Sequence, residues 1–316
     1  MLRAAALLFA LALALPASGV AASAPAIPPG AEGAPAVLET SPRHGEWVNI
    51  PLDGEPTSTP LSAYVVYPER KDKAPVVIVI QEVYGLTPWL RAVADRLAAD
   101  GFIAIAPDYL SGMGPGGGGT DSVASRDEVV KLTRSLTPEE VVRRTNAARA
   151  YGVALPAATG KVGTVGFCWG GGRSFAYAAQ SPPPDAAVVY YGTSPATESL
   201  ARVRAPVLGL YGGDDARVNA TVPAAEAELK RLGKTFAVET YAGAGHGFLR
   251  QQEGREANRA AAEKAWPRTI EFLRQALAPR TSSTGAAFAL EAVFEPATSG
   301  DDCHDVCATP VDVAGR

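Results

Sequence analysis

A cysteine held between two glycines, after an apolar strand and before a helix, restricts the fold of this chain more than any other feature. Residues 161–167 have the composition of a short buried strand, and residues 168–172 begin the helix that follows. In so tight a turn side chains at Gly166 and Gly170 would collide. The turn places Cys168 at a helix N-terminus, which lowers a thiol pKa and offers free N–H groups. We expect Cys168 to be a nucleophile, with a small buried apolar residue as the structural alternative.

The first residues of the 316-residue chain have the pattern of a secretory signal peptide. Arg3 gives a positive start, residues 4–15 are an apolar run, and residues 16–26 are rich in small side chains. The run is too short for a stable membrane span. We therefore expect residues 1–24 to be a signal peptide of an exported (periplasmic or secreted) protein, with an uncleaved anchor as the alternative. Residues 25–40 are rich in Pro, Ala and Gly, which predicts a flexible lead-in.

Cysteine use agrees with export, because an oxidising compartment favours disulfides. The chain has three cysteines, and Cys303 and Cys307 lie close together in a polar C-terminal tail, residues 281–316. A local disulfide between them would leave Cys168 free. The alternative for the tail is a metal site that also uses His304.

The middle of the chain alternates strands and helices, and this predicts one α/β domain over residues 41–280 with a mostly parallel sheet. Asp53-Gly54 is a turn signal between the first two strands, which should form an antiparallel edge. The glycine-rich stretch 111–120 lacks a phosphate-loop ending, and we expect a mobile surface loop near the site. Net charge is −4, which argues against nucleic acid as a partner. The expected strands are 46–52, 61–67, 74–80, 102–107, 161–167, 186–192, 205–211 and 235–241, and the expected helices are 88–100, 125–135, 138–151, 168–180, 222–232 and 258–277.

Three chemically active residue types fall in a set order: a thiol after one strand, an acid after a later strand, and a histidine after the next. After the thiol come Asp214 and Asp215, which compete as the acid, and then His246. His246 is the one histidine of the expected core, since His44 lies before it and the third lies in the tail. The order nucleophile, acid, histidine is that of α/β-hydrolases. In such a set the histidine takes the nucleophile's proton and the acid orients the imidazole.

Four separated motifs resemble those of the dienelactone hydrolase family. They are Gly166-Phe167-Cys168-Trp169-Gly170-Gly171, Gly212-Gly213-Asp214-Asp215, Ala244-Gly245-His246-Gly247-Phe248 and Gln81-Glu82-Val83-Tyr84-Gly85. The resemblance covers about residues 45–278. It implies an α/β-hydrolase fold, a mostly parallel central sheet with helices on both faces.

The resemblance also assigns roles to individual residues. It implies that Cys168, Asp215 and His246 are catalytic, and that Glu82 contacts the resting thiol and changes partner when substrate binds. The backbone N–H groups of Val83 and Trp169 would form the oxyanion hole. Arg126 and Arg250 match the two arginines that bind a substrate carboxylate in the family; the alternative for each is a solvated surface charge.

These features together predict a cofactor-independent hydrolase with no metal in its site. It would cleave a small-molecule lactone or carboxylic ester, an anionic one where the arginines bind its carboxylate, through a thioester acyl-enzyme. Another ester, such as a sugar acetate, is an alternative substrate. A non-catalytic thiol-based sensor or binding protein is the alternative from another class. No nucleic acid and no stable membrane span is expected.

Overall fold

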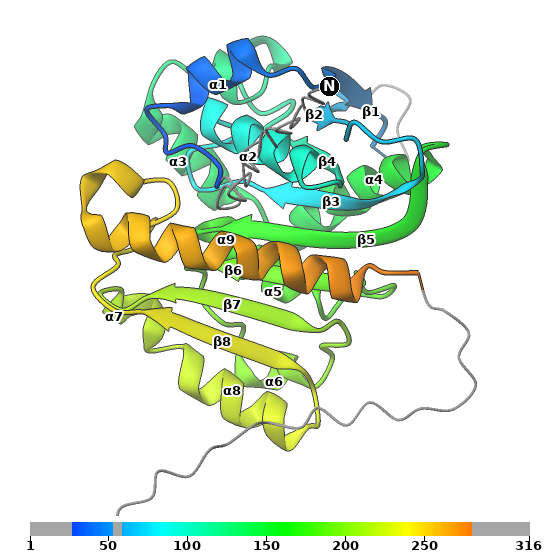
Figure 1. Cartoon of the computed structure of the whole chain (residues 1–316). Helices are drawn as coiled ribbons and strands as arrows, with labels where there is room; N and C mark the ends of the chain where they lie inside the picture. The colour runs from blue at the N-terminus through cyan, green and yellow to red at the C-terminus, as the bar shows by residue number, and fades with distance from the viewer. Residues whose placement is uncertain (1–26, 53–58, 280–316) are drawn as a thin grey trace, which may run out of the picture. The chain divides into compact units, whose positions relative to one another are not determined.

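One twisted sheet organises the structure, a computed structural model that describes residues 27–52 and 59–279 (Figure 1). The strands follow the order β1-β2-β4-β3-β5-β6-β7-β8. β2 runs antiparallel to both of its neighbours, and the pairs from β4 through β3 to β8 are parallel. The strands are β1 (Gly45–Ile50), β2 (Leu61–Val66), β3 (Ala74–Ile80), β4 (Ile103–Pro107), β5 (Ala158–Phe167), β6 (Ala186–Tyr190), β7 (Val207–Gly212) and β8 (Phe236–Tyr241).

Helices cover both faces of the sheet, as parallel strand connections require. α1, α2 and α9 pack on one face, and α4, α5 and α8 supply residues to the core on the other. This architecture confirms the predicted α/β-hydrolase fold class. The helices are α1 (Ala34–Thr40), α2 (Pro88–Ala99), α3 (Arg126–Ser135), α4 (Pro138–Ala154), α5 (Trp169–Tyr177), α6 (Thr197–Leu200), α7 (Ala216–Asn219), α8 (Val222–Arg231) and α9 (Glu256–Ala276).

The central strands form because their sequences suit burial on two faces. β3 reads Ala-Pro-Val-Val-Ile-Val-Ile, and its last five residues are all buried. β-Branched side chains fill such a strand well. β4 and β6 are also buried along their whole length. Their carboxyl ends therefore meet at one edge of a rigid sheet, where ligand sites of open α/β folds form.

The stretch expected to be a flexible lead-in is packed against the domain from residue 27 onward, which corrects that prediction. The Pro28 carbonyl accepts a hydrogen bond from Gln252 Nε2 (2.9 Å), and the Pro29 carbonyl accepts one from Trp89 Nε1 (3.0 Å). The Ala31 N–H donates to the Arg250 carbonyl (2.9 Å). Composition predicted flexibility, but these tertiary contacts fix the segment. The expected signal peptide, the Asp53-Gly54 turn and the tail with its two cysteines lie outside the described residues.

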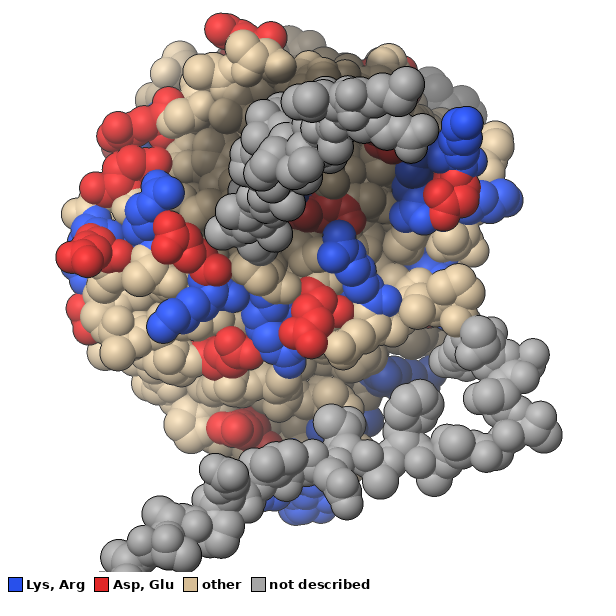
Figure 2. Space-filling model, in the orientation of Figure 1, with Lys and Arg blue, Asp and Glu red and all other residues tan. Residues whose placement is uncertain are grey.

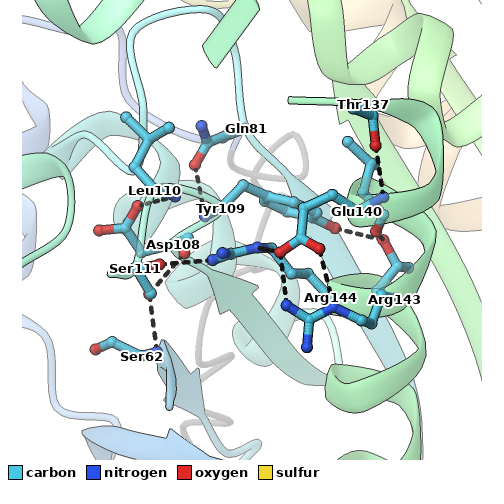
Figure 3. Close-up of polar contacts among 12 residues, drawn as sticks. Ser62, Gln81, Asp108, Tyr109, Leu110, Ser111, Thr137, Glu140, Arg143 and Arg144 are labelled. Atoms are coloured by element: carbon cyan, nitrogen blue, oxygen red, sulfur yellow. Dashed lines mark hydrogen bonds and ion pairs between the residues drawn. The ribbon is translucent and has the colours of Figure 1, made fainter. Parts of the chain in front are cut away.

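A buried polar network supports the loops at the carboxyl edge (Figure 3). Gln81 Oε1 accepts from the Tyr109 N–H (3.1 Å), and the Tyr109 hydroxyl lies 2.8 Å from Thr145 Oγ1 on α4. Arg144, also on α4, reaches from Glu140 (2.6 Å) to the Ser111 carbonyl (2.8 Å). Hydrogen bonds of this kind hold the elements that they join in place, although the buried Gln81 Nε2 has no partner among the described residues.

The glycine-rich loop is also more anchored than expected. It contains the short 3₁₀ turns Pro115–Gly117 and Thr120–Ser122. The buried Asp108 carboxylate accepts hydrogen bonds from the Thr120 N–H and hydroxyl, both at 2.7 Å. The loop is therefore held in place at Thr120, its C-terminal end.

The visible surface carries charges of both signs. On the face in Figure 2, acidic and basic side chains are interspersed and do not gather into a patch of one sign. Within residues 27–52 and 59–279, no helix has the length and apolarity needed to cross a membrane.

Candidate active site

The predicted turn at Cys168 has the strained geometry that its two glycines allow. Cys168 has φ 56° and ψ −116°, a left-handed conformation that residues with a side chain rarely adopt. A Cβ at Gly166 would overlap the Gly170 carbonyl, and one at Gly170 would overlap the carbonyl oxygens of Ile80 and Gln81. The Cys168 N–H donates to the Tyr190 carbonyl (3.0 Å), which ties the turn to β6. The sulfur is therefore held where β5 ends and α5 begins.

The structure brings together the expected histidine and one of the two competing acids. His246 Nδ1 lies 2.5 Å from Asp215 Oδ2, and Asp215 is only 6% exposed. Asp214 instead points outward, with a 56% exposed side chain that pairs with Arg255 at 2.9 Å. Asp215 also caps α7 by accepting from the Val218 N–H. A buried acid on Nδ1 leaves Nε2 of the imidazole free for proton transfer.

Cys168 and His246 line the same cavity, which has a volume of about 1030 Å³. Val83 and Trp169 line it too. The backbone N–H groups of both residues hydrogen-bond to the Cys168 sulfur and lower its pKa. Two N–H groups that converge on one sulfur have the arrangement of donors that can bind an oxyanion.

The resting thiol is nevertheless a weak acid, and this differs from the sequence-based expectation. The pKa of Cys168 is raised to about 11, first by burial and second by the charge of Glu82. The helix N-terminal N–H groups act in the expected direction, but burial outweighs them. The free thiol is therefore neutral at pH 7 and needs help to become a thiolate.

Glu82 lies at the base of the cavity and is paired with an arginine. Its side chain is 2% exposed, and Arg250 Nε lies 2.8 Å from Glu82 Oε2, a close ion pair without hydrogen-bond alignment. Burial raises the pKa of Glu82 to about 7, against the opposing charges of Arg250 and Arg126. The expected contact with the resting thiol is thus electrostatic here, and the carboxylate's close partner is Arg250.

Comparison with known proteins identifies the group to which this site belongs. The model of the dienelactone hydrolase family matches residues 61–277, more than half of the chain. The chain belongs to the dienelactone hydrolase family. A carboxymethylenebutenolidase of Pseudomonas putida is 32% identical over 206 residues, which cover 64% of this chain and 86% of that protein.

Two further relatives agree with this membership. A candidate carboxymethylenebutenolidase of Methylorubrum extorquens is 31% identical over 229 residues, covering 68% of this chain and 77% of that one. A crystal structure of a candidate dienelactone hydrolase from Klebsiella pneumoniae is 28% identical to this chain, with a TM-score of 0.64. The match covers 74% of this chain and 99% of that one. The chain is therefore a dienelactone hydrolase-like enzyme, a hydrolase that acts on lactones or esters.

The two arginines expected to bind a substrate carboxylate both lie close to one aromatic ring. The Arg126 guanidinium carbon lies 3.7 Å from the centroid of the Tyr84 ring, and that of Arg250 lies 5.4 Å from it. Arg250 and Tyr84 line the main cavity, whereas Arg126 lines a smaller neighbouring cavity of about 340 Å³. Ala31 of the packed lead-in also lines this smaller cavity.

Three cavity residues were missed by reasoning from sequence. Tyr191 directly follows β6 and has φ 40°. Its ring meets the His246 ring edge-on at 5.2 Å, and its buried hydroxyl has no partner among the residues that the structure describes. The sequence Val-Val-Tyr-Tyr around it resembles an ordinary strand. Only its position at the carboxyl edge of the sheet could have indicated a place in the site. Arg173 and Arg217 also line the cavity. Their positions in the sequence could have indicated this, because Arg173 lies five residues after Cys168 and Arg217 lies two residues after Asp215.

Metal-ligating side chains do not cluster in this part of the chain. Among the described residues, no three His, Cys, Asp or Glu side chains lie together as a metal would require.

Proposed function

We propose that this hydrolase works through a Cys168 nucleophile, a His246 base and an Asp215 acid, with a thioester acyl-enzyme. The observation that carries the proposal is the 2.5 Å pair of His246 Nδ1 and Asp215 Oδ2 beside the cavity that the strained Cys168 lines. A thiol sensor needs no such acid–histidine pair, so this pair favours catalysis over the sensor alternative.

The reaction proceeds in two steps. His246 Nε2 takes the thiol proton as the sulfur adds to the substrate carbonyl, and the N–H groups of Val83 and Trp169 stabilise the oxyanion. The oxyanion collapses and the C–O bond breaks, while the imidazolium returns its proton to the departing oxygen. In a lactone this oxygen stays attached to the acyl group through the carbon chain of the opened ring. Water then gives a proton to His246 as its oxygen adds to the thioester carbonyl. The C–S bond breaks, the carboxylic acid leaves, and the imidazolium returns its proton to the sulfur.

Glu82 couples substrate binding to activation of the thiol. A thiol with a pKa of about 11 requires a local change before it ionises readily. A substrate carboxylate that binds Arg250 competes with Glu82, whose Oε2 lies 2.8 Å from Arg250 Nε. Arg126, which lies over the Tyr84 ring, supplies a second positive charge for the substrate carboxylate. The released Glu82 carboxylate then gains freedom to assist removal of the thiol proton. The substrate class is accordingly a small anionic lactone or ester.

Export of the protein is part of the proposal. The N-terminal pattern of a positive start, an apolar run and small residues supports a signal peptide ending near residue 24. N-terminal sequencing of the mature protein from a cell fraction outside the cytoplasm tests it. A mature chain that begins at Met1 would contradict it.

Substitution of the nucleophile tests the catalytic proposal. Cys168→Ala and prior treatment with iodoacetamide should each abolish hydrolysis of activated aryl esters and lactones. Circular dichroism and the melting temperature of the variant report whether it folds. Full activity in folded Cys168→Ala would refute the nucleophile.

A further inference from the structure

The main cavity continues past the reacting groups along one side of α5. Trp169, Gly172, Arg173 and Ala176 line it from the helix, and Gln180 lines it just beyond the helix end. The nine residues of α5 span about 13 Å at the usual rise of about 1.5 Å per residue. The cavity therefore has room for a substrate arm that extends well beyond the scissile bond.

This extended cavity is lined mainly by positive charge. Five arginines and two glutamates line it: Arg134, Arg173, Arg202, Arg217, Arg250, Glu82 and Glu139. Arg250 is the ion-pair partner of Glu82. Arg173 and Arg217 have no carboxylate within ion-pair distance among the described residues. A site with this balance favours an anionic ligand.

Arg173 is held in place by the residue that follows the nucleophile. Its guanidinium carbon lies over the Trp169 ring, 5.0 Å from the centroid, one helical turn along the same face of α5. A guanidinium that contacts a ring through its face keeps its N–H edge for a carboxylate. Arg173 is partly buried, and this desolvation lowers its pKa. An anionic partner would relieve the cost of holding a desolvated charge unpaired.

Arg217 brings a second positive charge from another element. It lies on α7, two residues after Asp215, and it is close enough to the sulfur that its charge lowers the pKa of Cys168. Arg173 and Arg217 thus reach the cavity from α5 and α7, whereas Arg250 reaches it from the loop after β8. These three arginines therefore reach the cavity from three separate elements.

We propose that Arg173, assisted by Arg217, is a second anion subsite that binds a free carboxylate carried by the substrate at a distance from the scissile carbonyl. The inference rests on the proposed function and deepens it. Arg173 is five residues beyond Cys168, a helical rise of about 7 Å. The substrate class is then a half-ester of a dicarboxylic acid with a spacer of about four to six methylenes, or a lactone that carries a free carboxylate on a spacer of about that length.

Matched acyl chains with and without a terminal carboxylate test the subsite. The 4-nitrophenyl half-esters of adipate and suberate are compared with the neutral hexanoate and octanoate esters of equal length. The wild type should show a higher kcat/KM for each half-ester than for its neutral partner. Arg173→Gln should lower kcat/KM about tenfold more for the half-ester than for the neutral ester, mainly through KM, since a charge-assisted hydrogen bond is lost. Arg173→Glu should reverse the preference.

A surface arginine provides the control. Arg231 on α8 pairs with Glu228 and does not line the cavity, so Arg231→Gln should keep the wild-type preference. Melting temperatures show whether the variants remain folded. An unchanged preference in folded Arg173→Gln, or no preference in the wild type, would overturn the subsite.

Direct binding separates failure of this inference from failure of the proposed function. Adipate binding is measured by calorimetry with the wild type and Arg173→Gln, which needs no turnover. The expected result is a dissociation constant about tenfold larger for the variant. Equal affinity would overturn the subsite even if Cys168 is the nucleophile. Retained hydrolysis of the neutral hexanoate ester by Cys168→Ala would instead overturn the mechanism alone.

Discussion

His246 Nδ1 lies 2.5 Å from Asp215 Oδ2, while the neighbouring Asp214 pairs with Arg255 at the surface. The same two aspartates thus occupy different environments, one 6% exposed and the other with a 56% exposed side chain. This contrast supplies a matched pair of variants for the role of the acid.

Asp215→Asn should lower kcat by about 10²–10⁴-fold, because an amide cannot hold the imidazole in the tautomer that accepts the thiol proton. Asp214→Asn should change kcat by less than about threefold, as expected for an exposed ion pair. Steady-state hydrolysis of 4-nitrophenyl hexanoate measures both. Equal losses in the two variants would contradict the assignment of Asp215.

Glu82→Gln should make the resting thiol more acidic and more reactive. The carboxylate's charge is the second cause, after burial, that raises the pKa of Cys168 to about 11. Its removal should move the pH profile of Cys168 alkylation by iodoacetamide to lower pH, read by mass spectrometry of the Cys168 peptide. Slower alkylation at neutral pH in the variant would contradict this effect of Glu82 on the resting thiol.

Glu82 should also make stability depend on pH in a defined direction. Burial raises its pKa from 4.5 to about 7, so between these values the folded state holds a proton that the unfolded state has lost. The free energy of unfolding therefore falls as pH rises through this window, by about 3 kcal/mol at most from this one group. Denaturant titrations should show a flatter profile for Glu82→Gln. Parallel profiles from pH 4.5 to 7 for the two proteins would be inconsistent with a raised pKa.

The turn that contains Cys168 should not tolerate a side chain at Gly170. Gly170→Ala places a Cβ into the carbonyl oxygens of Ile80 and Gln81, and it should cost more than about 3 kcal/mol or prevent folding. Gly254→Ala is the control, since a Cβ there meets no atom within 4 Å. It should shift the free energy of unfolding by less than about 0.5 kcal/mol. Similar melting temperatures for both variants would show that the contact at Gly170 can relax.

How much the sequence predicts depends on whether a feature is local. Gly166, Cys168 and Gly170 define the turn by themselves, and the order of strands and helices indicates the sheet. The choice between Asp214 and Asp215 needed the family resemblance, because adjacent turn carboxylates look alike in sequence. The three-dimensional contact with His246 distinguishes them directly.

Other properties depend on contacts between distant segments. The rise in the Cys168 pKa reflects burial and Glu82, which outweigh the local N–H groups, and sequence shows only the latter. The lead-in is Pro- and Ala-rich, yet hydrogen bonds to Trp89 and Gln252 hold it in place. The positive charge of the cavity was hidden because Arg173 and Arg217 lie on different elements, α5 and α7.

The most direct test of the central claim is the mass of the enzyme during turnover. The wild-type enzyme, which keeps the His246 base that acylation needs, is mixed with excess 4-nitrophenyl hexanoate and quenched in acid within the first turnovers. The thioester mechanism predicts one hexanoyl group per chain, which neutral hydroxylamine releases as it does a thioester and which maps to the peptide that contains Cys168. A hexanoyl group on another residue, or wild-type turnover with Cys168 already blocked by iodoacetamide, would contradict it.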